Sequence, residues 1–322
     1  MAVVDALPAE ALPWWRRAWE NLRSASSALA FMAPATFLVI TFFFIPVVLI
    51  IGISMTNLST ATGFQNWEWV LFENYRKILT HPNTPKVLRN TLMYVALTLA
   101  FFNVGMALVI ALITTHLPRR TGLFYRALWL LPRLTPSVVY VMMWKYMAAD
   151  APYGIINRHI LQPLGFKTTN LLPAYPWVFV ILVNGFIGAS FGMVIFTSAI
   201  ESIPRDYLMA SLVDGCSVWQ RIRYIILPMI RWPLLFVTTY QTLSLLTSFE
   251  QILLLTGGQF GTMVWSLWAY ERALSNYWGN FQWGFGAALA TLLVVIGIVM
   301  AVVYMRYFQF EELVQEPKIE AL

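Results

Sequence analysis

The sequence predicts an all-α fold, a polytopic membrane helix bundle with about six transmembrane helices. Of its 322 residues, 59% are hydrophobic and only 11% are charged, whereas a soluble globular chain carries about 25% charged residues. The apolar residues gather in stretches close to the roughly 20 residues that span a bilayer. The 14 Trp residues suit aromatic belts at the membrane interfaces. These observations indicate that the chain is folded in a lipid bilayer.

Five of the stretches contain no charged residue, and they cover residues 28–55, 91–115, 176–200, 232–249 and 283–305. A sixth, residues 124–147, is interrupted by Arg126, Arg133 and Lys145. Arg126 and Lys145 can snorkel toward the two ends of that span. Arg133 lies several residues inside, so we expect its side chain to face protein or a water-filled cavity.

These spans define a membrane domain over residues 28–306, flanked by residues 1–27 and 307–322. Residues 12–27 mix Trp with Arg, which predicts a helix lying in the cytoplasmic interface. Residues 307–322 form an acidic tail. Six spans place both ends on one side, and the loops on that side hold more Arg and Lys than the opposite loops if the side is cytoplasmic. The sequence therefore predicts a multi-pass protein of the cytoplasmic (inner) membrane.

Several functions are disfavoured by the polar residues. The net charge of +6 is spread between apolar stretches, without the basic runs of a nucleic-acid binder. Cys216 is the single cysteine, and the three His residues lie outside the spans, so we expect no metal or cofactor site. No Gly-x-x-x-x-Gly-Lys-Ser/Thr pattern occurs, so the chain has no P-loop for ATP.

Residues 202–228, between the fourth and fifth spans, form the most informative polar segment. Ser202 can cap a helix, Pro204 suits its first turn, and Asp206 adds a favourable negative charge there. Gly215 can end that helix at a positive φ. A second helix then runs toward Pro228, which cannot continue it without a kink. Local chemistry thus predicts two short helices joined by a turn, which by itself could be a simple interfacial connector.

This segment resembles the EAA loop of binding-protein-dependent ABC importer permeases. The family pattern is EAA, three residues, G, nine residues and I-x-L-P, and Gly215 is followed by nine residues that end at Pro228 in Ile-Ile-Leu-Pro. The first half departs from the pattern, because Met209 and Ser211 replace the usual Glu and second Ala. Ala210 matches, and Asp206 keeps an acidic residue earlier in the loop.

Further short motifs resemble the carbohydrate-transporting, maltose-type branch of that family. They occur in the family's order over about residues 28–306, at 74–75, 90–92, 124–132, 154–157, 249–252 and 255–258. The usual Pro after the glycine pair is absent, since Gln259 follows Gly258.

The resemblance implies a complex in which this chain is a transport subunit and not an enzyme. The implied partners are a second homologous permease, a dimer of ATP-binding subunits that holds ATP and Mg, an extracytoplasmic solute-binding protein, and a sugar or sugar-like solute. It also implies that the cytoplasmic EAA coupling loop docks on the ATPase. The residues expected to contribute are Asp206, Leu208, Met209, Ala210, Ser211, Leu212, Asp214, Gly215 and Pro228. Leu208, Met209 and Leu212 would supply an apolar face, and Asp214 would hold the turn.

Two other classes of membrane protein compete with this interpretation. An ion-coupled secondary transporter would usually need titratable groups or ion ligands deep in the membrane, but five spans contain no charged residue. A membrane enzyme would need a nucleophile and a base at membrane depth, and no His or Cys lies in a span.

Polar and aromatic side chains within the spans are candidates for the substrate pathway. Aromatic faces with hydroxyl and amide groups suit sugars, which favours Tyr240 and Gln241. Other candidates are Ser244, Asn184 and Arg133, and Glu250 and Arg133 either pair with each other or line the pathway. For the polar residues inside helices, helix–helix hydrogen bonding is the competing role.

Overall fold

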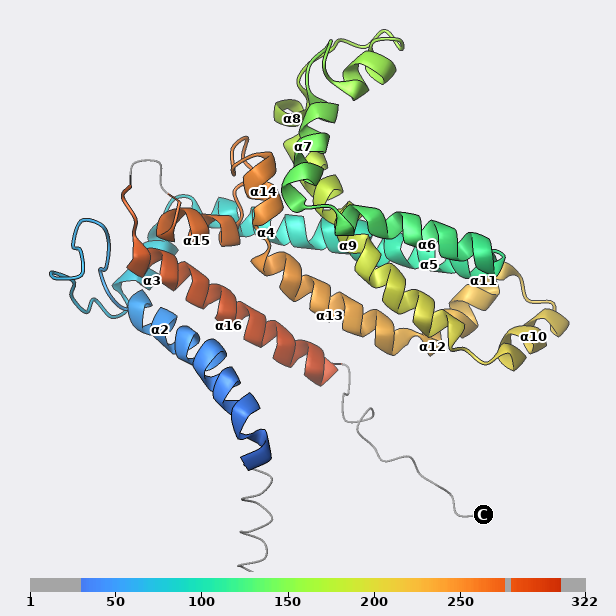
Figure 1. Cartoon of the computed structure of the whole chain (residues 1–322), viewed down its shortest axis with the longest axis horizontal. Helices are drawn as coiled ribbons and strands as arrows, with labels where there is room; N and C mark the ends of the chain where they lie inside the picture. The colour runs from blue at the N-terminus through green and yellow to red at the C-terminus, as the bar shows by residue number, and fades with distance from the viewer. Residues whose placement is uncertain (1–29, 276–278, 308–322) are drawn as a thin grey trace, which may run out of the picture. The chain divides into compact units, whose positions relative to one another are not determined.

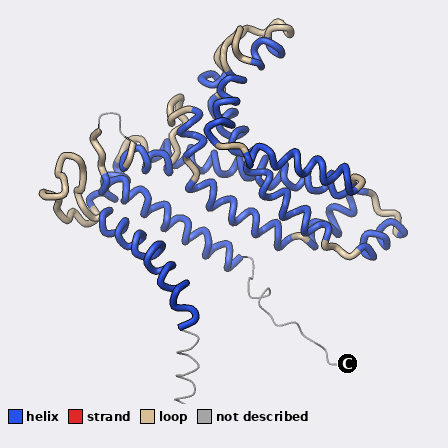
Figure 2. Tube along the Cα trace, viewed as in Figure 1, coloured by secondary structure: helices blue, strands red, loops and turns tan. Residues whose placement is uncertain are grey.

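The structure, a computed structural model, describes residues 30–275 and 279–307. These residues form helices joined by loops (Figures 1 and 2), with one isolated bridge that pairs Thr56 and Trp69. The predicted interfacial segment 1–27 lies outside the described residues, as does the predicted tail beyond residue 307. The chain divides into two units, Met1–Ile53 and Ser54–Leu322.

The described part of the first unit belongs to an apolar helix, Ala30–Ser54, which contains the π-helical turn η2 (Ile40–Phe44) and α2 (Ile45–Ser54). Its 25 residues rise about 38 Å, enough to cross a bilayer. An apolar helix of this length suits contact with lipid or with another membrane protein.

The second unit contains three further long apolar helices. Thr84–His116 joins α4 (Thr84–Thr98), the π-helical segment η3 (Leu99–Met106) and α5 (Ala107–His116). The other two are α9 (Pro176–Glu201) and α16 (Trp283–Tyr307). They confirm the predicted helices over 91–115, 176–200 and 283–305.

The predicted count of six spans is not confirmed. Four described helices are long and apolar enough to cross a membrane, and a fifth follows if Val218–Met229 and Arg231–Thr247, which meet at 71°, form one bent span. The predicted third span is not one helix but two, α6 (Arg119–Leu134) and α7 (Ser137–Ala148). Pro136 causes this break, because proline disfavours helical backbone at the preceding Thr135, which is extended with ψ 135°.

The remaining elements are short and lie between the long helices. Outside the segment that links α9 to α13, they are α3 (Glu73–Thr80), η4 (Asn157–Leu161), α8 (Leu171–Ala174), α14 (Glu250–Leu255) and α15 (Trp265–Ala273).

Helix α9 lies at the centre of the second unit, in contact with α5, α6, α13 and η3. Its glycines allow the close approach to η3. A Cβ on Gly188 would lie 2.2 Å from Asn103 Oδ1, and one on Gly192 would lie 2.4 Å from the Asn103 carbonyl oxygen. Small residues at such a contact let two backbones pack closely in a membrane, where van der Waals packing replaces the hydrophobic effect.

Buried asparagines fix the loops around this core. The Asn74 amide donates to the carbonyls of Ser54 (2.9 Å) and Thr56 (2.7 Å). Asn90 donates to Gly261 and Met263, both at 2.9 Å. Asn157 donates to Ala149 (2.6 Å) and Thr169 (2.8 Å). Each amide therefore satisfies two backbone carbonyls of loops or helix ends, which gives a structural reason for three of the motif asparagines.

The close approach of α9 predicts a stability difference between two glycines. Gly192→Ala places a methyl group against the η3 backbone, so we expect a loss of about 1–3 kcal/mol. Gly297→Ala is the matched control, because its nearest neighbour would be Leu243 Cδ2 at an ordinary 3.7 Å. Thermal unfolding of the two variants in detergent measures the difference. Equal melting temperatures would contradict the packing described here.

Candidate functional site

The loop between α9 and α13 folds as two short helices and a turn, as predicted. Helix α10 (Arg205–Val213) is followed by α11 (Val218–Arg221), η5 (Ile222–Ile226) and α12 (Leu227–Met229), which leads into α13 (Arg231–Thr247). Gly215 has φ 72°, which confirms the predicted positive φ. Three backbone bonds close the turn, from the amides of residues 214, 215 and 216 to the carbonyls of 210, 212 and 211.

The helix caps differ from those predicted. Ser202 does not cap α10: its Oγ donates to the Ala199 carbonyl at the end of α9, and Pro204 directly precedes α10. Ser217 instead caps α11, in a capping box with Gln220. The hydrogen bonds recorded for the described residues do not include the Asp214 carboxylate, so the turn depends on the Gly215 backbone.

Helices α10 and α11 present an apolar surface to their surroundings, which we call the α10–α11 surface. Its exposed side chains are Tyr207, Met209, Leu212, Val213, Val218 and Trp219. Met209 and Leu212 agree with the predicted apolar face, whereas Leu208 is partly buried against the bundle core. Ser211 is buried, with its Oγ donating to the Leu208 carbonyl at 2.7 Å. Asp206, Ala210, Asp214 and Pro228 are exposed.

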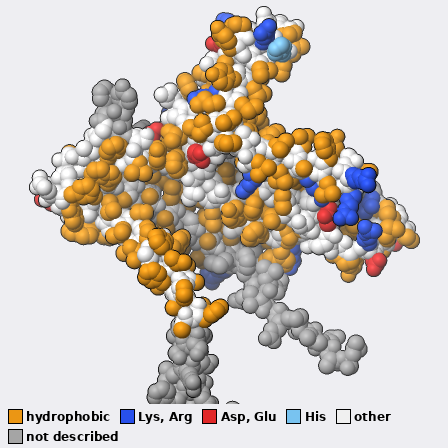
Figure 3. All heavy atoms as spheres, in the orientation of Figure 1, with side chains coloured by type: hydrophobic (Ala, Val, Ile, Leu, Met, Phe, Trp, Pro, Cys, Tyr) orange, Lys and Arg blue, Asp and Glu red, His pale blue; other side chains and the backbone are white. Residues whose placement is uncertain are grey.

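An exposed apolar surface with charged neighbours is typical of a site for another protein. Arg119, Arg126, Arg205 and Arg221 line a cavity of about 650 Å³ behind the α10–α11 surface. Figure 3 shows Lys and Arg side chains gathered at this end of the second unit. Arg126 pairs with Glu201 at 2.6 Å and also donates to Thr114 Oγ1 at 3.0 Å. These two contacts of Arg126 connect α6 with α5 and with the end of α9. The segment between α9 and α13 therefore begins at a fixed position.

A second feature lies on α13 and α9, where aromatic rings stack in a row that we call the aromatic ladder. The Tyr240 ring stacks on Phe191 with centroids 4.8 Å apart and is nearly parallel to Phe236 at 6.3 Å. The Arg133 guanidinium carbon lies 5.7 Å from the Phe191 centroid, within the range of a cation–π contact. Tyr240, Phe236 and Arg133 are exposed.

The other predicted pathway residues fall into two groups. Gln241 and Asn184 are buried, and their amides donate to the carbonyls of Gly188 (2.9 Å) and Val180 (3.0 Å), which favours a packing role. Ser244 is exposed one turn beyond Tyr240. Glu250 is exposed and accepts a hydrogen bond from Ser137, and no ion pair with Arg133 is recorded in the described part of the chain.

Sequence reasoning missed Phe191 and Phe236. Phe236 could have been found, because it precedes Tyr240 by four residues and Ser244 by eight, a spacing that places all three on one helix face. Phe191 lies on a different helix, and nothing in the sequence pairs it with Tyr240.

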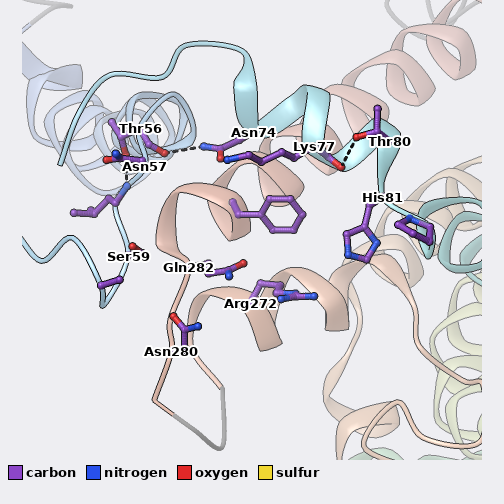
Figure 4. A pocket seen from close by; sticks show the side chains of 14 residues that line it. Thr56, Asn57, Ser59, Asn74, Lys77, Thr80, His81, Arg272, Asn280 and Gln282 are labelled. Carbon is purple, nitrogen blue, oxygen red and sulfur yellow. Dashed lines mark hydrogen bonds between the residues drawn. The ribbon is translucent and has the colours of Figure 1, made fainter.

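A polar cavity of about 660 Å³ lies at the far end of the second unit, between α3, α15 and the start of α16. In Figure 4 the side chains of Arg272, His81 and Gln282 lie around one space, with Asn74 and Lys77 on α3. Arg272 also lies 5.8 Å from the Phe285 ring centroid. Partial burial raises the pKa of the neighbouring Glu271 carboxyl, and the Arg272 charge opposes that shift. The cavity offers amide and cationic groups to a polar molecule.

Comparison with known proteins identifies the class. Residues 103–310 match the family "Binding-protein-dependent transport system inner membrane component". The chain is 26% identical to the sulfoquinovosyl glycerol transport system permease protein SmoG of Agrobacterium fabrum, over 94% of this chain and 96% of that protein. It is also 26% identical to the trehalose/maltose transport system permease protein MalF of Thermococcus litoralis, over 89% and 95% of the two chains.

The fold agrees with this match. A chain in the crystal structure of a bacterial ABC transporter involved in the import of the acidic polysaccharide alginate superimposes with a TM-score of 0.76 at 21% identity. The superposition covers 90% of this chain and 98% of that one. The chain belongs to the family of binding-protein-dependent transport system inner membrane components, which are membrane permeases and not enzymes. Nothing in these comparisons supports the ion-coupled alternative.

Substitutions of the neighbouring residues Tyr240 and Gln241 should affect different properties, solute uptake in one case and thermal stability in the other. Gln241→Leu removes a buried hydrogen bond between α13 and α9, so thermal stability should fall by about 1 kcal/mol. Tyr240→Leu changes an exposed ring and should leave assembly intact while lowering solute uptake. Melting temperature and uptake, measured on both variants, separate the roles. Normal uptake by a stable Tyr240→Leu protein would remove the aromatic ladder from the pathway.

Proposed function

We propose that this chain forms half of the translocation pathway of an ATP-driven importer in the inner membrane, and that the imported solute is a carbohydrate. It works with a second, similar permease, a dimer of ATP-binding subunits and an extracytoplasmic solute-binding protein. The observation that carries the proposal is the exposed α10–α11 surface, held on a glycine turn at the end of α9.

The α10–α11 surface has the properties of a docking site for a partner subunit. Trp219 and Val213 are 67% and 88% exposed, a costly arrangement for aromatic and aliphatic side chains in water. The basic cavity behind the surface adds charge for an acidic partner. The chain has no P-loop, so ATP hydrolysis requires another subunit.

Exposed polar groups on α6, α13 and α14 support a second permease. Arg133, Ser244 and Glu250 are all exposed, although they belong to the apolar bundle. Charged groups that face hydrocarbon cost several kcal/mol each. A second permease that covers these helices would enclose the polar groups around a polar passage.

The carbohydrate assignment has two supports. The aromatic ladder offers flat apolar rings next to hydroxyl and cationic groups, a combination that suits sugar rings. Similar permeases include a sulfoquinovosyl glycerol transport permease and a trehalose/maltose transport permease.

The turn at Gly215 provides the test of coupling. A Cβ there would touch no atom within 4 Å, so Gly215→Val strains only the backbone, by about 1–2 kcal/mol at φ 72°. We expect normal membrane insertion, but loss of the ATP-binding subunits or of the ATPase stimulation by loaded binding protein. Asp214→Lys should weaken docking less, because its carboxylate does not close the turn.

Gly165→Val is the matched control, since Gly165 has φ 77° and equally open space in a loop far along the chain from the α10–α11 surface. Both variants carry the same backbone strain. Any difference in coupling between them therefore results from the position of the substitution in the protein. Co-purification and ATPase rate are measured in the same membranes. Full coupling in the Gly215→Val complex would refute the docking role.

A further inference from the structure

Arg133 lies near the middle of the membrane bundle. Its partner ring belongs to Phe191, which is 15 residues after Pro176 and 10 residues before Glu201, the two ends of α9. At 1.5 Å per residue, the ring is about 22 Å and about 15 Å from those ends. A permanently charged guanidinium therefore lies at a depth where the surrounding helices are apolar.

No acidic side chain of the described residues neutralises this charge. The ion pairs recorded there are Arg76–Glu73 and Arg126–Glu201. Glu250, the acidic residue of the neighbouring α14, accepts a hydrogen bond from Ser137. Arg133 contacts the Phe191 ring and is otherwise exposed. An arginine cannot release its proton, so its charge stays in place and must meet water, a partner or a passing anion.

Of these three possibilities, the aromatic ladder beside Arg133 favours a passing anion. Phe191, Tyr240 and Phe236 continue from the guanidinium as nearly parallel rings, with interplanar angles of 25° and 19°. Rings of this kind offer flat apolar surfaces, and the stack holds the guanidinium beside them with its donors free. Such a fork of donors binds carboxylate, sulfonate or phosphate groups in a bidentate manner.

We propose that Arg133 is a specificity-determining residue and that the natural substrate is an anionic carbohydrate, whose acidic group passes Arg133 while its sugar ring lies on the aromatic ladder. This proposal rests on the carbohydrate import proposed above and names the substrate class. Arg133 lowers the cost of carrying the negative charge through the centre of the bundle.

The test uses the full complex of both permeases, the ATP-binding subunits and the binding protein in proteoliposomes. The probes are a glucuronic-acid-containing disaccharide and its neutral glucose counterpart. The maximal ATP-driven uptake rate is measured at saturating binding protein. We expect Arg133→Gln to lower uptake of the acidic disaccharide about tenfold or more, the loss of one charge-assisted contact. Arg133→Lys keeps the positive charge but loses the bidentate fork, so its rate should lie between those of Arg133→Gln and the unaltered complex.

Arg306→Gln is the control, because it removes the same charge from an exposed position in the last turn of α16. Its uptake rates should match those of the unaltered complex. The proposal is overturned if Arg133→Gln leaves acidic uptake unchanged or lowers neutral and acidic uptake equally. It is also overturned if this variant loses the second permease on purification, because Arg133 would then be an interface residue.

The outcome also separates this proposal from the one on which it rests. Uptake of only the neutral disaccharide by the unaltered complex would refute the anionic substrate and leave carbohydrate import standing. Absence of ATP-driven uptake for either sugar would refute both.

Discussion

The close contact between α9 and the π-helical segment η3 is the constraint on which the rest of the second unit depends. Without side chains at Gly188 and Gly192, the two backbones come near enough for Asn103 to lie directly against α9. Gln241 then reaches the Gly188 carbonyl, which sets α13 beside the same helix. Lipid offers no hydrophobic drive for helices to associate, so this packing carries much of the organisation.

The position of α9 determines where both proposed functional surfaces lie. The aromatic ladder starts at Phe191 in its middle, and the coupling segment leaves from its end after the Arg126–Glu201 pair. About 15 Å of continuous helix separates the two sites. If a partner displaces the α10–α11 surface, one rigid helix would pass that displacement to the ladder. This connection gives a physical route from ATP-driven movement to the solute pathway.

The sequence was informative wherever a single local pattern decides the structure. Uninterrupted apolar length predicted α9, α16 and the helix through η3, and the chemistry of Gly215 predicted the turn. The sequence was less informative where the structure depends on contacts between segments that are far apart in the chain. The apolar length of residues 124–147 predicts one helix, whereas Pro136 divides this stretch into α6 and α7. Ser202 bonds to the helix before it, a choice that depends on how α9 ends. Phe191 and Tyr240 meet only through the folded bundle.

The proposed docking of the α10–α11 surface is tested most directly at Cys216, the single cysteine of the sequence, which lies beside Gly215 in the turn. A short photoactivatable crosslinker attached to this thiol in the assembled complex reports what lies next to the α10–α11 surface. Docking on the ATPase predicts crosslinks to an ATP-binding subunit, identified by mass spectrometry and strongly reduced when those subunits are stripped from the membrane. Crosslinks only to lipid or to other parts of this chain, with the ATP-binding subunits present, would contradict it.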